Sequence, residues 1–151
     1  MSPTDLASRY QRISSRVAEL GGGKACLMAV SKTQPVAAIR ALYDLGHRDF
    51  GENYVQELVE KATELSEAGC DGIRWHFIGH LQTNKAKALM PWVFAVHSVD
   101  SLKLAAELAK RWRAAGRTGQ LPVFVETNID GEASKSGVSP TRLRAMAESA
   151  R

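Results

Sequence analysis

The feature that most restricts the fold of this 151-residue chain is a repeated alternation of short apolar segments with helical patterns. After a leading amphipathic helix predicted over residues 3–20, an apolar segment followed by a helical pattern occurs five times. The predicted strands are residues 25–30, 47–53, 73–79, 92–98 and 121–128. Strands that alternate with helices predict an α/β fold with a parallel sheet and crossover helices.

The helices that separate these strands are delimited by ordinary start and stop residues. Pro35 starts the first of them and Gly46 ends it, Gly69 ends the second, and Asp100 or Ser101 caps the fourth. The predicted helices are residues 35–45, 54–68, 81–90, 101–115 and 140–151. Two architectures remain open, a doubly wound sheet and a (β/α)₈ barrel, although a closed barrel takes roughly 250 residues.

Composition favours a cytoplasmic globular protein. Hydrophobic residues make up 44% of the chain, and its apolar segments are too short to cross a bilayer. The N-terminus shows no secretory signal, and the two cysteines do not form a disulfide framework. The net charge of +4 is a mild excess. We therefore expect neither a membrane nor a nucleic acid as partner.

Lys32 lies at the carboxyl end of the first predicted strand, in the turn before Pro35. In folds built from strands and helices, binding and catalytic sites form at that end of the strands. Burial disfavours a charged ammonium group, and a neutral amine is a nucleophile that forms Schiff bases with carbonyl compounds. The alternative is a lysine that simply reaches solvent from a loop.

Other polar residues follow the predicted strands at the same end. They are Glu52 and Asn53, His76 to His80, His97, Ser98 and Asp100, and Thr127 and Asn128. Taken singly, Asn53 and Asp100 fit helix caps, and His76 fits a hydrogen-bonded core residue. Their gathering on one rim with Lys32 instead indicates a site. No Gly-rich phosphate loop follows the first strand, and Gly79 breaks the His76–His80 spacing, so no metal site is expected.

Four blocks of sequence, together, are similar to one known family. They are Ala29-Val30-Ser31-Lys32-Thr33, Phe50-Gly51-Glu52-Asn53-Tyr54-Val55-Gln56-Glu57, Trp75-His76-Phe77-Ile78-Gly79-His80-Leu81-Gln82-Thr83-Asn84-Lys85 and Gly131-Glu132-Ala133-Ser134-Lys135-Ser136-Gly137. They cover residues from about 25 to 140. In this order they resemble the pyridoxal-phosphate homeostasis protein family of the YggS/PROSC type. His80 stands where some members have Pro, and Gln34 where some have a second Lys.

The resemblance implies the fold and the cofactor site. The fold would be part of a (β/α)₈ TIM barrel of the alanine racemase N-terminal type, a fold-type III pyridoxal-phosphate domain. Lys32 would hold pyridoxal 5'-phosphate as a Schiff base, and Asn53 and His76 would lie close to the cofactor ring. Lys135 resembles a family lysine that handles or passes on the cofactor.

The resemblance also implies the function. The protein would bind pyridoxal phosphate and take part in intracellular vitamin B6 homeostasis, with PLP-dependent apoenzymes as recipients and no robust reaction of its own. The alternative is a fold-type III enzyme, an amino-acid racemase or lyase. Such racemases need a second acid/base from another domain, and this chain is too short to contain one.

The number of predicted strands sets an expectation for domain organisation. Residues 1–151 supply five strands of the eight-stranded barrel, a single domain that forms its N-terminal portion, without the C-terminal strands that carry the phosphate site. Either the chain is a fragment, or it closes by pairing with a second copy as an oligomer. A third interpretation is a binding module that uses basic residues of the last two helices. The simpler explanation, that these side chains face solvent on the outer helices of a barrel, is stronger. Those residues include Lys103, Lys110, Arg111, Arg113 and Arg117.

Overall fold

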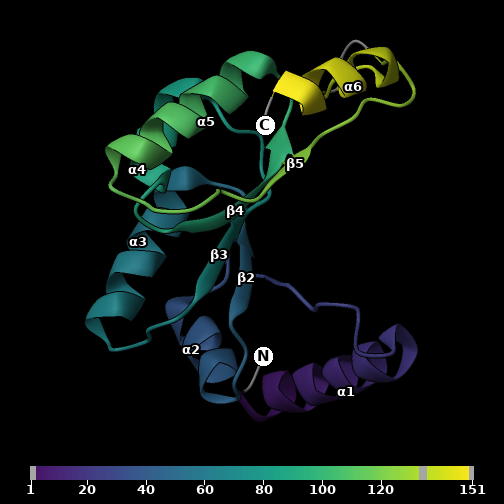
Figure 1. Ribbon diagram of the computed structural model, residues 1–151. Helices are drawn as coiled ribbons and strands as arrows, with labels where there is room; N and C mark the ends of the chain where they lie inside the picture. Colours follow the sequence, from purple (N-terminus) through teal and green to yellow (C-terminus); the bar gives the residue numbers. More distant parts are fainter. Residues whose placement is uncertain (1–2, 133–135, 150–151) are drawn as a thin grey trace.

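A single parallel sheet of five strands organises the chain, in a computed structural model that describes residues 3–132 and 136–149 (Figure 1). The strands are β1 (Ala29–Val30), β2 (Asp49–Glu52), β3 (Arg74–Phe77), β4 (Val93–Val99) and β5 (Val123–Val125). Their order in the sheet is β1-β2-β3-β4-β5, and every pairing is parallel. Sequential order with parallel pairing is the arrangement of one arc of a (β/α)₈ barrel, so the predicted fold class is confirmed.

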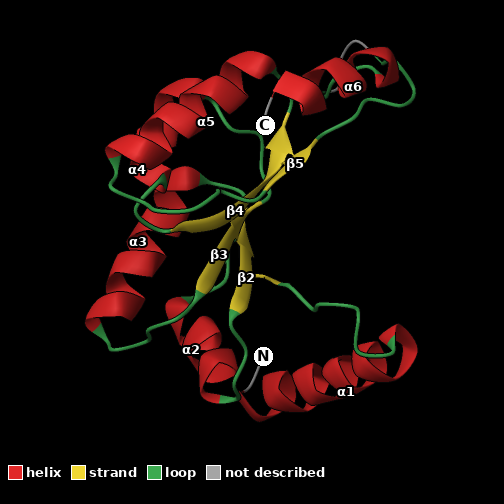
Figure 2. Cartoon of the chain, in the orientation of Figure 1, coloured by secondary structure: helices red, strands yellow, loops and turns green. Residues whose placement is uncertain are grey.

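The helices connect successive strands. They are α1 (Pro3–Gly21), α2 (Val36–Asp44), α3 (Val55–Glu67), the 3₁₀ turn η1 (Thr83–Lys85), α4 (Ala86–Leu89), α5 (Leu102–Ala114) and α6 (Pro140–Ser149). Figure 2 shows α2, α3, α4 and α5 along one side of the sheet, with α1 and α6 near its two ends. In the part of the chain that the structure describes, no helix combines the length and the apolar character needed to span a bilayer.

The hydrophobic core lies between the sheet and these helices. Side chains alternate along a strand, so Phe50 of β2 and Phe77 of β3 point to the helix side and are fully buried. They meet the apolar stripes of the helices, represented by Leu58 of α3 and Leu104 of α5. Burial of each such side chain stabilises the fold by about 1.5–3 kcal/mol. The core therefore fixes which face of each strand looks toward the helices.

The opposite face of the sheet is open. Val30 of β1, Phe94 of β4 and Phe124 of β5 are 49%, 41% and 55% exposed, respectively. Large apolar side chains of this kind fill the interior of a closed barrel. We call this the inner face, because it corresponds to the barrel interior, and the described residues leave it uncovered.

The structure differs from the sequence-based predictions mainly at the edges of the sheet. The predicted strands 25–30 and 121–128 are reduced to the short strands β1 and β5, each of which pairs with one neighbour only. The predicted helix 81–90 is divided into η1 and α4. The cap predicted at Asp100 or Ser101 is Ser101, whose hydroxyl accepts a hydrogen bond from the Leu104 backbone N–H.

Candidate functional site

Lys32 stands in a tight turn directly after β1. The turn is closed by a hydrogen bond of 3.0 Å from the Gln34 backbone N–H to the Ser31 carbonyl. Val30 pairs with Gly51 in the sheet. Lys32 comes two residues after Val30 and Asn53 two residues after Gly51, so both lie at the same edge of the sheet. The Lys32 side chain is exposed, so the described residues do not bury its ammonium group.

Thr33 gives this turn an unusual backbone. Its φ is +62°, the only positive φ of a non-glycine residue in the described parts of the chain. A β-branched residue there is a true outlier and costs about 1–3 kcal/mol. The Thr33 backbone N–H donates a hydrogen bond of 2.6 Å to Oε1 of Glu57 on α3. The turn that carries Lys32 is therefore strained and is held from a neighbouring helix.

A buried ion cluster lies behind the turn. Lys61 Nζ on α3 donates hydrogen bonds to the Ser31 carbonyl at 2.7 Å, to Glu52 Oε1 at 2.8 Å and to Glu57 Oε1 at 2.7 Å. The Ser31 hydroxyl donates to the same Glu52 oxygen at 2.7 Å. All three donors of the ammonium are used, and the Lys61 and Glu52 side chains are only 8% and 0% exposed. We call Glu52, Glu57 and Lys61 the buried triad.

The sequence analysis placed Glu52 on one rim with Lys32 and Asn53, but in the structure the Glu52 side chain belongs to the buried triad. Glu52 points to the helix side of the sheet, where it pairs with Lys61, while Lys32 lies beyond the strand end. Glu57 is 23% exposed. Burial raises the pKa of Glu57, but hydrogen bonds from Lys61 and from the Thr33 N–H outweigh it and lower that pKa below the ordinary value. Both carboxylates therefore act as acceptors for the turn.

Sequence reasoning missed Lys61 and Glu57, although a signal was present. Lys61 falls three residues after Leu58 and four before Leu65, within the buried stripe of α3. A charge inside an apolar stripe needs a partner, and Glu57 is four residues earlier on the same helix. That spacing was sufficient to predict a buried pair, but the contact with the Ser31 carbonyl depends on how the tertiary structure places α3 beside the turn after β1.

Asn53 follows β2 and is not the helix cap that its position allowed. The N-cap of α3 is Tyr54, and no side chain caps it. The Asn53 Oδ1 atom is buried and has no hydrogen-bond partner among the described residues. Gly79 packs so closely on the Asn53 backbone that a Cβ at Gly79 would overlap the Asn53 carbonyl oxygen. The site therefore contains an unpaired acceptor in a fixed position.

His76 lies on the inner face, deeper in the sheet than Asn53. It pairs in register with Gly51, two residues before Asn53, and its Nε2 lies 3.0 Å from Asp49 Oδ1. A carboxylate only accepts, so Nε2 carries a hydrogen, and neutral His76 accepts at Nδ1 from His97 Nε2 at 2.9 Å. Burial lowers the pKa of His97, and the positive charge that His76 carries when it is protonated lowers that pKa further. The His97 ring stacks on Phe124, with centroids 4.4 Å apart.

Asp49 anchors this inner-face network and makes it sensitive to acid. Hydrogen bonds from Arg74, and then from His76, hold the pKa of Asp49 well below its usual range, although burial raises it. The unfolded-state pKa is about 3.9. The ionised form therefore stabilises the fold above that pH, and this contribution is lost as the pH falls toward the folded-state pKa.

We expect acid to destabilise the chain partly through Asp49. Between about pH 5 and about pH 2, the unaltered chain should lose about 1–2 kcal/mol more unfolding free energy than Asp49→Asn does. This range is kept small because solvent screens the interaction of Asp49 with the half-exposed Arg74. Urea unfolding of both proteins at a series of pH values measures the difference. Equal pH dependence in the two proteins would contradict the role given to Asp49.

The remaining predicted positions are not part of these contacts. Lys135 lies outside the described residues. His80 is exposed and has Nδ1 3.5 Å from Asp100 Oδ2. Within the described ranges, no three His, Cys, Asp or Glu side chains are arranged to hold a metal ion.

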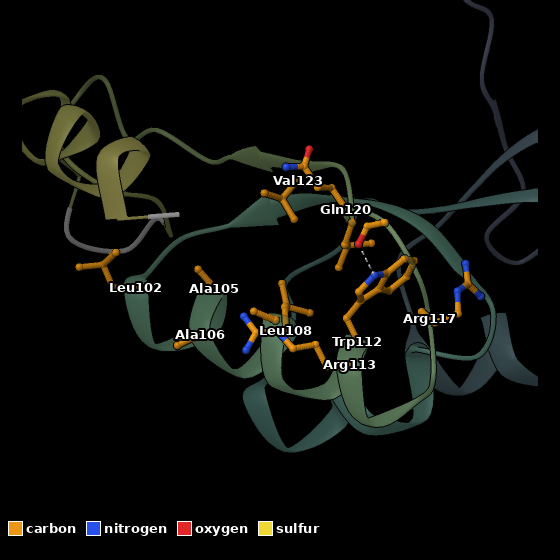
Figure 3. Close-up of a pocket in the computed structure, with 12 residues that line it drawn as sticks. Leu102, Ala105, Ala106, Leu108, Trp112, Arg113, Arg117, Gln120 and Val123 are labelled. Carbon is orange, nitrogen blue, oxygen red and sulfur yellow. Dashed lines mark hydrogen bonds between the residues drawn. The ribbon is translucent and has the colours of Figure 1, made fainter. Parts of the chain in front are cut away.

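A groove of about 760 Å³ lies elsewhere, along α5 and β5 (Figure 3). Leu102, Ala105, Leu108 and Val123 contribute to its wall, and the Trp112 indole N–H donates to the Gly119 carbonyl at 3.1 Å. None of the residues predicted for the cofactor site lines the groove. The candidate site is therefore the carboxyl edge of β1 to β3 and the adjoining inner face.

Comparisons with known proteins agree with this architecture. The chain is 42% identical over 141 residues to the pyridoxal phosphate homeostasis protein of Bos taurus, covering 91% of this chain and 52% of the relative. The chain is 48% identical over 122 residues to the protein of the same name from Pseudomonas aeruginosa, and the match covers 81% of this chain and 51% of that relative. The chain thus spans about half the length of these curated relatives.

A solved structure shows the same fold. The PipY protein of Synechococcus elongatus PCC7942, solved with PLP bound, superposes with a TM-score of 0.70 at 36% identity, covering 90% of this chain and 62% of PipY. The resemblance inferred from the four sequence blocks is thereby confirmed. The family model described as alanine racemase, N-terminal domain, matches residues 2–151, and the chain belongs to that family.

Proposed function

We propose that this chain binds pyridoxal 5'-phosphate and serves in intracellular pyridoxal-phosphate homeostasis, with the cofactor held as a Schiff base on Lys32. The observation that carries the proposal is the similarity to PipY, a protein solved with PLP bound, across 90% of this chain. The names of the curated relatives support the homeostasis role.

The geometry of the strand ends fits a cofactor of this kind. Lys32 is exposed, so a carbonyl group can reach its amine. The buried Asn53 Oδ1 lacks a donor among the described residues, and a buried acceptor without a partner costs about 1–3 kcal/mol. A donor supplied from outside the described residues would remove that cost. These two groups lie at the same edge of neighbouring strands.

In this proposal each residue has a limited task. When bound, the cofactor supplies an aldehyde and an electron-withdrawing ring. Lys32 would provide the amine that anchors it, Asn53 would accept a hydrogen bond, and His76 would lie close to the ring, with its own nitrogens engaged by Asp49 and His97. Lys135 would handle or pass on the cofactor. A carrier role needs no second acid/base group beside Lys32, whereas a racemase or lyase does.

Domain organisation, partners and location complete the proposal. The sheet order supports residues 1–151 as a single domain that supplies the first five strands of a barrel, with the phosphate-binding loops after strands seven and eight lying outside it. We propose PLP-dependent apoenzymes as recipients and the cytoplasm as the location. Closure of the open inner face by further strands or by a second copy is part of the same proposal.

A spectroscopic titration tests the function. We expect the purified chain to develop the visible band of a protonated imine when pyridoxal phosphate is added. Borohydride reduction followed by peptide mapping should then place the cofactor mass on the peptide that contains Lys32. Label distributed over many lysines, or no band, would refute the proposal. Turnover of an added amino acid, measured by chiral chromatography, would favour the racemase alternative.

A further inference from the structure

The turn that carries Lys32 is held by one internal hydrogen bond and by contacts from α3. Within the described structure, the Ser31 carbonyl accepts from Gln34 N–H and from Lys61 Nζ, and the Thr33 N–H donates to Glu57. The contacts of the buried triad thus engage the residues on both sides of Lys32. Lys32 itself takes part in none of them.

The backbone of Thr33 needs such support. Its left-handed φ of +62° is unfavourable for a β-branched residue, and such conformations persist only where surrounding contacts impose them. At this residue the Thr33 N–H donates a short hydrogen bond of 2.6 Å to the Glu57 carboxylate. Lys61 holds that same carboxylate oxygen at 2.7 Å and so fixes its position.

We propose that Glu57, oriented by Lys61, is a positioning residue that holds the Lys32 turn in its strained conformation and thereby presents the amine to the cofactor. Condensation of an amine with an aldehyde is faster when the amine is already placed, because the entropic cost is met in advance. The effect on cofactor binding rests on the proposed function. The support that Glu57 gives to the turn can be measured without any cofactor.

An ordinary helix salt bridge is the competing explanation. Glu57 and Lys61 are spaced i,i+4 on α3, and such pairs stabilise helices without any role in a site. That explanation does not require the bond to the Thr33 N–H. It predicts that loss of Glu57 changes helix stability and leaves the turn and the cofactor chemistry unchanged.

The test compares Glu57→Ala with Glu60→Ala, a matched removal of an exposed glutamate on the same helix. In the cofactor-free chain, Glu57→Ala should speed hydrogen exchange of the Thr33 amide by about tenfold or more, the loss expected when a support for a strained turn is removed. At limiting pyridoxal phosphate, borohydride trapping on Lys32 should fall by a similar factor. Glu60→Ala should change neither quantity.

A second variant separates positioning from general stability. Glycine adopts φ of +62° without steric cost, so Thr33→Gly combined with Glu57→Ala should restore most of the Lys32 trapping. A purely structural role for Glu57 would give no such rescue. All variants are compared at a temperature at which circular dichroism shows them fully folded.

The outcomes distinguish the inference from the function on which it rests. Unchanged Thr33 exchange in Glu57→Ala, or trapping that Thr33→Gly fails to restore, overturns the positioning role. Absence of cofactor on Lys32 in the unaltered chain overturns the proposed function instead, and the exchange measurement still decides whether Glu57 clamps the turn.

Discussion

Replacing Lys32 by Ala is expected to abolish the visible imine band formed with pyridoxal phosphate. Lys32 is the lysine at the carboxyl edge of β1, at the level of Asn53, and the exposed side chain makes no packing contribution that the fold needs. We therefore expect the band to fall by about tenfold or more while the unfolding free energy changes by less than about 0.5 kcal/mol.

The matched control for Lys32→Ala is Lys24→Ala. Lys24 is also exposed but precedes β1, so it lies toward the opposite end of the strand. It tests whether any exposed lysine near this strand reacts with the aldehyde. Absorbance titration and borohydride mapping of both variants measure the effect. A band that survives in Lys32→Ala, or disappears in Lys24→Ala, would contradict the assignment of the anchoring amine.

Lys61→Met is expected to cost about 3–5 kcal/mol of unfolding free energy, the largest effect on stability predicted for this chain. The ammonium makes three hydrogen bonds of 2.7–2.8 Å, and its removal leaves the fully buried Glu52 carboxylate without its cation. Methionine retains the length and the apolar stem of the side chain. The loss therefore comes from the uncompensated charge and not from a cavity.

Two comparisons test that explanation. Lys110→Met changes the same side chain at an exposed position of α5 and should alter the unfolding free energy by less than about 0.5 kcal/mol. Glu52→Gln in the Lys61→Met background removes the unpaired charge and should recover part of the loss. Urea unfolding followed by circular dichroism gives all three values. A cost below about 1 kcal/mol for Lys61→Met would contradict a buried triad.

The sequence alone determined the order of elements and the position of Lys32. The apolar periodicity of α3 and α5 predicted both helices to within two residues at each end, because a 3.6-residue stripe is encoded locally. The alternation of strands and helices likewise required a parallel sheet. Lys32 lies after β1 as predicted, since the apolar run and Pro35 mark the strand end and the helix start without reference to the rest of the chain.

Only the tertiary structure decided which polar residues meet. Glu52 and Asn53 are adjacent in sequence, yet strand alternation and the packing of α3 direct Glu52 to Lys61 and leave the Asn53 Oδ1 atom unpaired among the described residues. The contacts that hold the Lys32 turn join side chains of β2 and α3 to backbone atoms of Ser31 and Thr33, and a backbone atom's partner cannot be inferred from its residue type. The short edge strands have the same cause, because a strand's hydrogen bonds depend on its neighbour and not on its own side chains.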